Sequence, residues 1–218
     1  MFPSSLRSSF RRSLISALAL GTLALSSPLL RAEPVAADAF VKTVAGEVID
    51  AVKADKAIQA GDVSRIRALV DAKVMPHVNF QRMTASSVGP QWRSATPDQQ
   101  KRMLVEFQTL MVNTYSGALT QVKDQAVVVK PLRPGAADSG DLVVRTEVRG
   151  KGDPIQLDYR LEKAGDGWKI FDVNVGGFWL VEAYKGQFAK DLSSGGLDAL
   201  ISRLTEKNKS LATSAAKN

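Results

Sequence analysis

The spacing of the apolar residues changes at Asp124, and this change constrains the fold more than any other feature of the chain. Before Asp124 the apolar residues recur about every 3.6 positions, as on the buried side of an amphipathic helix. After it, apolar and polar residues alternate in segments separated by Gly, Pro and Asp. The sequence therefore predicts an α+β domain, with helices over residues 35–122, a sheet over 126–175 and closing helices over 178–208.

The strongest local signal is the start of a long helix at Thr96. Thr96 suits the N-cap, Pro97 suits the first helical position, and Gln99 completes a capping box. Shorter helices are predicted from Val35 to about Lys56, from Asp62 to Pro76 and from Asn79 to about Gly89. The long helix carries a broad apolar stripe made of Met103, Leu104, Phe107, Leu110, Met111, Tyr115, Ala118 and Val122.

Four strands are predicted, joined in sequence as an antiparallel meander. They are Ala126 to Leu132, Leu142 to Val148, Ile155 to Leu161 and Trp168 to Val175, and turn residues such as Pro134-Gly135 and Asp138-Ser139-Gly140 separate them. In the third strand Ile155, Leu157, Tyr159 and Leu161 share one face, which we expect to be buried, and the opposite face is polar. Helices from Leu180 to about Leu192 and from Leu197 to about Leu204 are expected to follow, with a frayed tail after Asn208.

Residues 167–188 indicate an apolar cavity. A strand runs there into Gly176-Gly177 and directly into a helix start rich in large apolar side chains. A strongly twisted sheet packed against helices leaves a space that side chains or a ligand must fill. The plain alternative is that the aromatic residues form ordinary core. The expected cavity residues are Phe80, Met83, Phe107, Leu110, Met111, Tyr115, Leu119, Val143, Leu157, Tyr159, Val173, Val175, Phe178, Leu180, Tyr184 and Phe188.

The first 32 residues resemble an export signal. Arg7, Arg11 and Arg12 precede a run of about twelve apolar residues, which is too short for a membrane span of about twenty, and cleavage is expected after Ala32. Removing residues 1–32 takes away four of the 29 basic residues and none of the 22 acidic ones. We therefore expect one periplasmic domain over residues 33–218 with a net charge of +3 and no disulfides, because Cys is absent.

The sequence offers no convincing catalytic or metal site. His77 is the only histidine, and its place after Pro76 favours a capping or packing role. Asp172 is the best candidate acid, because alternation puts it beside Trp168 and Ile170, but an ion pair with Arg145 or Arg160 is the favoured interpretation. Nucleotide-binding and nucleophile motifs do not occur. We expect a protein without enzymatic activity, cofactor, metal or nucleic-acid partner.

Several segments together resemble the MlaC, or toluene-tolerance, family of periplasmic phospholipid-shuttle proteins. The resemblance covers nearly the whole chain after residue 32, and it depends on the order and spacing of its parts. These are Met75-Pro76-His77-Val78 with Phe80; Gly89, Trp92, Thr96-Pro97 and Gln99; Phe107, Leu110, Tyr115, Ala118 and Leu119; Gly167 to Val173; Gly177 to Leu180; Tyr184 and Phe188; and Gly196 to Leu200.

The resemblance implies an NTF2-like, cystatin-like fold that holds a phospholipid by its acyl chains, with the headgroup near the mouth of the cavity. It also implies a monomer that carries lipid between an outer-membrane lipoprotein–porin complex and an inner-membrane ABC transporter with a periplasmic substrate-binding subunit. Phe178-Trp179 departs from the smaller pair usual in the family, which predicts a narrower cavity or a reshaped mouth. Arg82 and Arg93 are candidates for attracting the headgroup, against a plain role as solvated charges.

Two other functions remain open at this stage. The same fold class hosts enzymes of the ketosteroid-isomerase type, which would require Asp172 to lie within reach of Tyr159 or Tyr115. A carrier of a hopanoid-type lipid would require the same apolar cavity as a phospholipid carrier.

Overall fold

A computed structural model describes residues 35–132 and 141–215 as one unit of helices and antiparallel strands. The expected signal over residues 1–32 and the turn residues of 133–140 lie outside the described part. In chain order the first helices are α1 (Ala37–Ala54), α2 (Lys56–Gln59) and α3 (Val63–Leu69). The π-helix η1 (Val70–Val74) and the 3-10 helix η2 (Met75–His77) continue directly from α3. Next come α4 (Phe80–Val88), the 3-10 helix η3 (Gly89–Ser94) and α5 (Pro97–Thr120).

Local capping explains where the helices begin. The side chains of Asp55, Asp62 and Asn79 accept backbone hydrogen bonds at the starts of α2, α3 and α4. Thr96 and Gln99 form the expected capping box before α5. The predicted helix from Asp62 is not uniform, because its α-helical hydrogen bonding gives way to the wider π-helical turns of η1 before Pro76.

The sheet contains six strands in the described residues, whereas four were expected. They are β1 (Ala126–Val129), β2 (Asp141–Val144), β3 (Thr146–Arg149), β4 (Ile155–Ala164), β5 (Gly167–Val175) and β6 (Phe178–Trp179). The order is β1-β3-β4-β5-β6, and β2 also pairs with β4; every pair is antiparallel. The expected second strand is divided at Arg145 into β2 and β3, and Phe178-Trp179 forms a short edge strand instead of starting a helix. The α+β class with an antiparallel sheet is confirmed.

A β-bulge at Phe171 changes which residues of β5 share a face. Arg160 pairs with Asp172 but Leu161 pairs with Ile170, so Phe171 is the extra residue. Alternation therefore restarts after Phe171, and Val173 and Val175 lie on the same apolar face as Trp168 and Ile170. The prediction that Asp172 shares their face was wrong, because it assumed an unbroken period of two.

The last helix, α6 (Leu180–Ala215), consists of two helical segments joined at Gly195 and Gly196. Gly196 has φ of 65°, a conformation that favours glycine, and a Cβ at Gly195 would lie 2.8 Å from that of Ala199. The two expected C-terminal helices are therefore present. The second extends to Ala215, beyond the fraying expected after Asn208.

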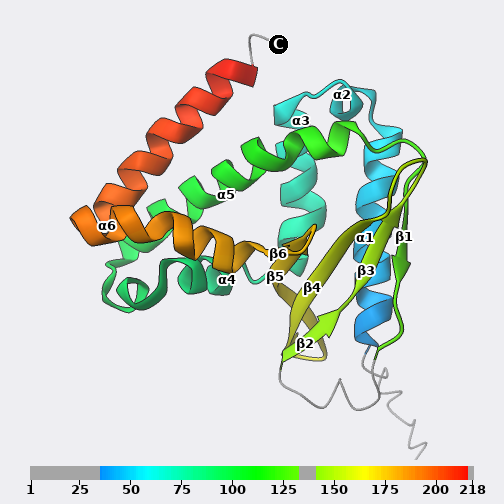
Figure 1. Cartoon of the computed structure of the whole chain (residues 1–218), viewed down its shortest axis with the longest axis horizontal. Helices are drawn as coiled ribbons and strands as arrows, with labels where there is room; N and C mark the ends of the chain where they lie inside the picture. The colour runs from blue at the N-terminus through cyan, green and yellow to red at the C-terminus, as the bar shows by residue number, and fades with distance from the viewer. Residues whose placement is uncertain (1–34, 133–140, 216–218) are drawn as a thin grey trace, which may run out of the picture. The chain divides into compact units, whose positions relative to one another are not determined.

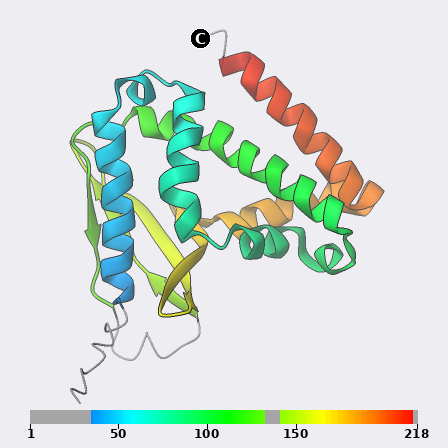
Figure 2. The same cartoon turned by 180° about the vertical axis from the view of Figure 1, so that it is seen from behind.

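The core consists of three clusters of buried side chains. One joins α4, α5 and α6 around Phe107. A second joins α1 to the sheet around Leu161, and Figures 1 and 2 show α1 lying along one face of the sheet. The third joins the end of α1 to α2, α3 and α5 around Ile66. Within the described ranges, no helix is both long enough and apolar enough to cross a bilayer.

Candidate functional site

The most distinctive site is an apolar cavity where the three core clusters meet. Its volume is about 330 Å³, at the lower end of the range usual for small-molecule pockets. Among the side chains that line it, only Gln108, Tyr115 and Ser116 carry a polar atom, and none is charged. The lining residues are Val48, Ile66, Leu69, Val70, Val74, Met75, Val78, Phe80, Met83, Gln108, Met111, Val112, Tyr115, Ser116, Ala118, Leu119, Leu157, Val173, Val175 and Leu180.

Each wall of the cavity comes from a different part of the fold. Helix α5 contributes the apolar stripe expected from the sequence, including Met111, Tyr115 and Leu119. The bulge at Phe171 turns Val173 and Val175 of β5 toward the same space, and Leu180 begins α6 there. The cavity is therefore formed by the apolar stripe of α5, the bulge in β5 and the junction between the sheet and α6.

Nine of the sixteen expected residues line the cavity. They are Phe80, Met83, Met111, Tyr115, Leu119, Leu157, Val173, Val175 and Leu180. Four others, Phe107, Leu110, Tyr184 and Phe188, belong to the helical core, where the ring of Phe107 lies 4.9 Å from that of Tyr184 and 5.3 Å from that of Phe188. These four side chains are buried in the helical core and do not line the cavity. Tyr159 is buried between α1 and the sheet and does not line the cavity either.

Val143 and Phe178 lie away from the cavity. Val143 pairs with Arg160 and points to the opposite face of the sheet, because Leu142 and Val144 are the buried residues of β2. Phe178 is 75% exposed beyond the Gly176-Gly177 turn. Trp179 also lies on the polar face, where the Arg160 guanidinium sits 4.0 Å from the centre of its ring. Neither Phe178 nor Trp179 lines the cavity, so the narrowing that was one of the two expectations for this pair is not seen.

One wall was missed from the sequence. Leu69, Val70, Val74 and Met75 reach the cavity from the end of α3 and from η1 and η2. Ile66, Leu69, Val70 and Val74 recur at helical spacing, which predicts an amphipathic helix but does not distinguish a cavity wall from a cover over the core. The π-helical turns, which a periodicity of 3.6 does not describe, were not foreseen; such turns are frequent at functional sites.

Two polar contacts join α5 to the segment that runs from α3 into η1. Arg67 Nη1 donates to Thr109 Oγ1 at 3.3 Å, and Gln108 Nε2 donates to Asp71 Oδ1 at 2.7 Å. On the other side of η1, Lys73 Nζ lies 3.2 Å from Glu47 Oε2 of α1. No side chain of η1 is fully buried. A segment without fully buried side chains can move at modest cost.

Asp172 lies outside the cavity, on the polar face of the sheet. Its Oδ2 accepts a hydrogen bond from Arg160 Nη1 at 2.9 Å, and its Oδ1 accepts from the backbone N–H of Val173 and of Val181, at 2.9 and 3.0 Å. Burial raises the pKa of the Asp172 carboxyl, and the hydrogen bond from Val181 and the charge of Arg160 oppose that increase. Because Asp172 holds the first turn of α6 and pairs with Arg160, the ion-pair interpretation is confirmed.

The other polar candidates have structural contacts. The ring of His77 packs against Phe40, with the two centroids 5.7 Å apart. Arg82 binds Glu162 and, at 2.8 Å, Asp141, and its guanidinium stacks 3.5 Å from the ring centre of Phe171. Arg82 is therefore neither a free headgroup ligand nor a solvated charge. Arg93 is exposed and does not line the cavity.

The fold is an α+β domain with a cavity lined almost entirely by apolar side chains, and comparison with known proteins identifies the family. The family model described as MlaC protein matches residues 42–206, and this chain belongs to that family. A solved phospholipid-binding protein from Ralstonia solanacearum, in complex with a phospholipid, is 42% identical and superposes with a TM-score of 0.79, over 82% of this chain and 99% of that one.

Two curated proteins are more distant relatives. Toluene tolerance protein ttg2D from Pseudomonas putida is 26% identical over 189 residues, which are 85% of this chain and 87% of that protein. The intermembrane phospholipid transport system binding protein MlaC from Haemophilus influenzae is 21% identical over 171 residues, which are 77% of this chain and 79% of that protein.

Proposed function

We propose that this protein is a phospholipid carrier that shelters acyl chains in the cavity between α5, η1 and β5. The observation that carries the proposal is the lining of that cavity, which is apolar on every wall and contains no charged side chain. Such a site recognises hydrocarbon and cannot orient a polar substrate by several hydrogen bonds. Membership of the MlaC family and the phospholipid complex of the Ralstonia solanacearum protein support the same ligand class.

The energetics of lipid transfer explain why such a protein needs a cavity and no catalytic group. Each buried methylene is worth about 0.8 kcal/mol, so two acyl chains of about sixteen carbons represent about 25 kcal/mol of transfer from water. Free lipid therefore does not cross an aqueous compartment at a useful rate. A carrier must bind nearly as well as a bilayer does, since a much poorer site does not extract lipid and a much better one does not return it.

A cavity of about 330 Å³ is small for a ligand with two long acyl chains, and we infer that it widens when lipid enters. Gln108–Asp71 is a polar bridge between η1 and α5, and Arg67–Thr109 joins the preceding α3 to α5. We infer that the η1 wall moves away from α5 to admit the chains.

The proposed setting is the periplasm, reached with the signal expected at residues 1–32. We propose that the carrier exchanges lipid with an outer-membrane lipoprotein–porin complex and with an inner-membrane ABC transporter that has a periplasmic substrate-binding subunit. This exchange would maintain the lipid asymmetry of the outer membrane. The name of the Haemophilus influenzae relative, which describes an intermembrane phospholipid transport system, supports this setting.

The ketosteroid-isomerase alternative is not favoured by the positions of its required groups. Asp172 lies on the opposite face of the sheet from the cavity, and Tyr159 is packed between α1 and the sheet. Tyr115 lines the cavity, but no acid lines it with Tyr115. We therefore propose a carrier without catalytic activity.

The proposed function is tested by purifying the mature protein without detergent and analysing it by native mass spectrometry. We expect a monomer carrying phospholipid, and we expect the protein to move phospholipid between donor and acceptor vesicles. Co-purification of a hopanoid-type lipid would change the cargo but keep the carrier. Protein that binds no lipid, before or after incubation with vesicles, would contradict the proposal.

A further inference from the structure

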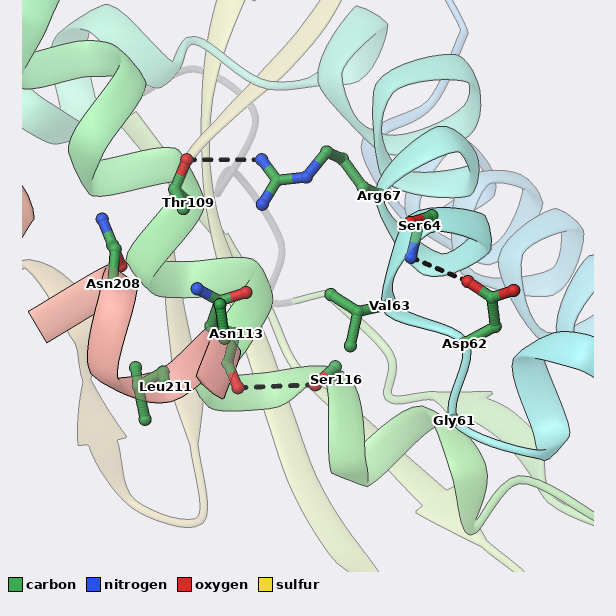
Figure 3. Close-up of a pocket in the computed structure, with 11 residues that line it drawn as sticks. Gly61, Asp62, Val63, Ser64, Arg67, Thr109, Asn113, Ser116, Asn208 and Leu211 are labelled. Atoms are coloured by element: carbon green, nitrogen blue, oxygen red, sulfur yellow. Dashed lines mark hydrogen bonds between the residues drawn. The ribbon is translucent and has the colours of Figure 1, made fainter. Parts of the chain in front are cut away.

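A polar groove adjoins the apolar cavity where α3 packs against α5. Figure 3 shows this groove of about 490 Å³ between α3, α5 and the C-terminal segment of α6. Seven of its eleven lining residues are polar or charged, whereas no charged side chain lines the cavity. Neighbouring residues of each helix line different spaces: Ile66 and Val112 line the cavity, and Arg67 and Asn113 line the groove. The cavity is therefore bounded here by side chains at the contact between α3 and α5.

The side chains of Ile66 and Val112 separate the two spaces, and we call this pair the partition. Ile66 is 1% exposed and Val112 is 6% exposed, and both belong to the same buried cluster. Ser116, one helical turn after Val112, lines both spaces, so the cavity and the groove come close together at this point. An acyl chain that reaches the partition is therefore stopped short of the polar groove by these two side chains.

The partition is stiff for local reasons. Ile66 and Val112 are β-branched residues in helices, where such side chains have one strongly preferred χ1 rotamer. Arg67, the next residue after Ile66, donates from Nη1 to Thr109 Oγ1 at 3.3 Å and so joins α3 to α5, as Figure 3 shows. A chain that displaced the partition would have to break this packing and would meet the Arg67 guanidinium, which hydrocarbon does not solvate.

The other walls of the cavity are more adaptable. Met75, Met83 and Met111 line it, and methionine is unbranched and fills irregular spaces in several rotamers. No side chain of η1 is fully buried. The cavity can therefore widen at these walls more readily than it can lengthen past the partition.

We propose that Ile66 and Val112 limit the length of the acyl chains that this carrier accepts. Once a chain reaches the partition, each further methylene stays outside the cavity, and a methylene left in water weakens binding about fourfold. A bilayer buries chains of any length, so the carrier should discriminate against phospholipids beyond a limiting chain length. This inference rests on the proposed function, because it narrows the cargo of the same cavity.

The test loads the protein from vesicles that contain equal amounts of phosphatidylglycerols with two identical saturated chains, which increase in length by single carbons across the series. Native mass spectrometry measures the amount of each lipid bound relative to its amount in the vesicles. For wild-type protein this ratio should fall beyond a limiting length. Ile66→Ala removes the branched end of the side chain and should move the limit up by about two or three carbons. Ile66→Val removes a single methylene and should move it by about one carbon.

Ile58→Ala and Ile58→Val are the matched controls. Ile58 is 2% exposed and belongs to the same buried cluster as the partition, but it does not line the cavity. These variants lose the same atoms from the core and should keep the wild-type limit. If Ile66→Ala does not fold, or folds without lipid, the comparison of Ile66→Val with Ile58→Val decides the question.

The contrary outcomes separate the two proposals. If the folded Ile66 variants keep the wild-type limit, or if the Ile58 variants move it equally, the partition does not set the chain length while the carrier function stands. If the wild-type ratio does not fall anywhere in the series, the partition is not a stop. If wild-type protein binds no phospholipid of any length, the proposed function itself fails.

Discussion

The two faces of the sheet near β4 and β5 differ in how their side chains are packed and paired. On the inner face Leu157, Val173 and Val175 leave a space that their neighbours do not fill. On the outer face Asp172, Arg160 and the start of α6 satisfy one another by hydrogen bonds. The inner face thus provides volume for a guest, whereas the outer face fixes the strand and the helix that define that volume.

The largest expected effect comes from placing a charge on the cavity side. Met111→Glu puts a carboxylate against the acyl chains, where it is poorly solvated, so the bound phospholipid should fall at least about tenfold. Native mass spectrometry of detergent-free protein measures the occupancy. Val105→Glu, on the same helix but 58% exposed and outside the cavity, is the matched control and should keep its lipid. If the two folded variants bind the same amount of phospholipid, Met111 does not face the acyl chains and the proposed position of the lipid is wrong.

A smaller and different effect is expected from the outer face. Asp172→Asn keeps one acceptor but places an amide N–H₂ against either the Arg160 guanidinium or the two backbone donors. The free energy of unfolding, measured by urea denaturation, should fall by about 2 kcal/mol. Lipid occupancy of the folded variant should not change. Loss of lipid from folded, otherwise native Asp172→Asn protein would show that the two faces are not independent.

The smallest effect is expected at the edge of the sheet. Replacing Phe178-Trp179 by Val-Ser removes an exposed ring and the stacking of Trp179 on Arg160. The stacking is worth about 0.5–1 kcal/mol, so only a slight loss of stability should appear in a thermal melt. The number of lipids and the range of chain lengths should match those of wild-type protein. A shift toward longer chains would show that these rings restrict the cavity after all.

The elements of this fold were largely predictable because their signals are local. Thr96, Pro97 and Gln99 specify a helix start by their own chemistry. The alternation along β4 predicted its buried face in part: Tyr159 and Leu161 are buried, but Ile155 is 56% exposed and Asp158 on the opposite face is buried. The bulge at Phe171 was not predictable in this way, because one extra residue in a strand leaves composition and turn signals unchanged. Its consequence for Asp172, Val173 and Val175 follows only from the register of β5 against β4.

The site was partly predictable for a related reason. Hydrophobicity identifies the residues that are buried, but it does not distinguish residues that fill the core from residues that line a cavity. Phe107 and Phe188 fill the helical core, whereas Met111 and Tyr115 on the same stripe line the cavity. The contributions of Val70 and Val74 depend on the π-helical turn.

The most direct test of the central claim locates the acyl chains themselves. Protein loaded with a phospholipid that carries bromine atoms near the ends of both chains is crystallised, and the anomalous scattering of bromine is mapped. We expect bromine peaks inside the apolar cavity, between Met111 of α5 and Val173 of β5, with the η1 wall displaced from α5. Bromine found only on the outer face of the sheet or on the surface, with the cavity closed by protein side chains, would contradict the account.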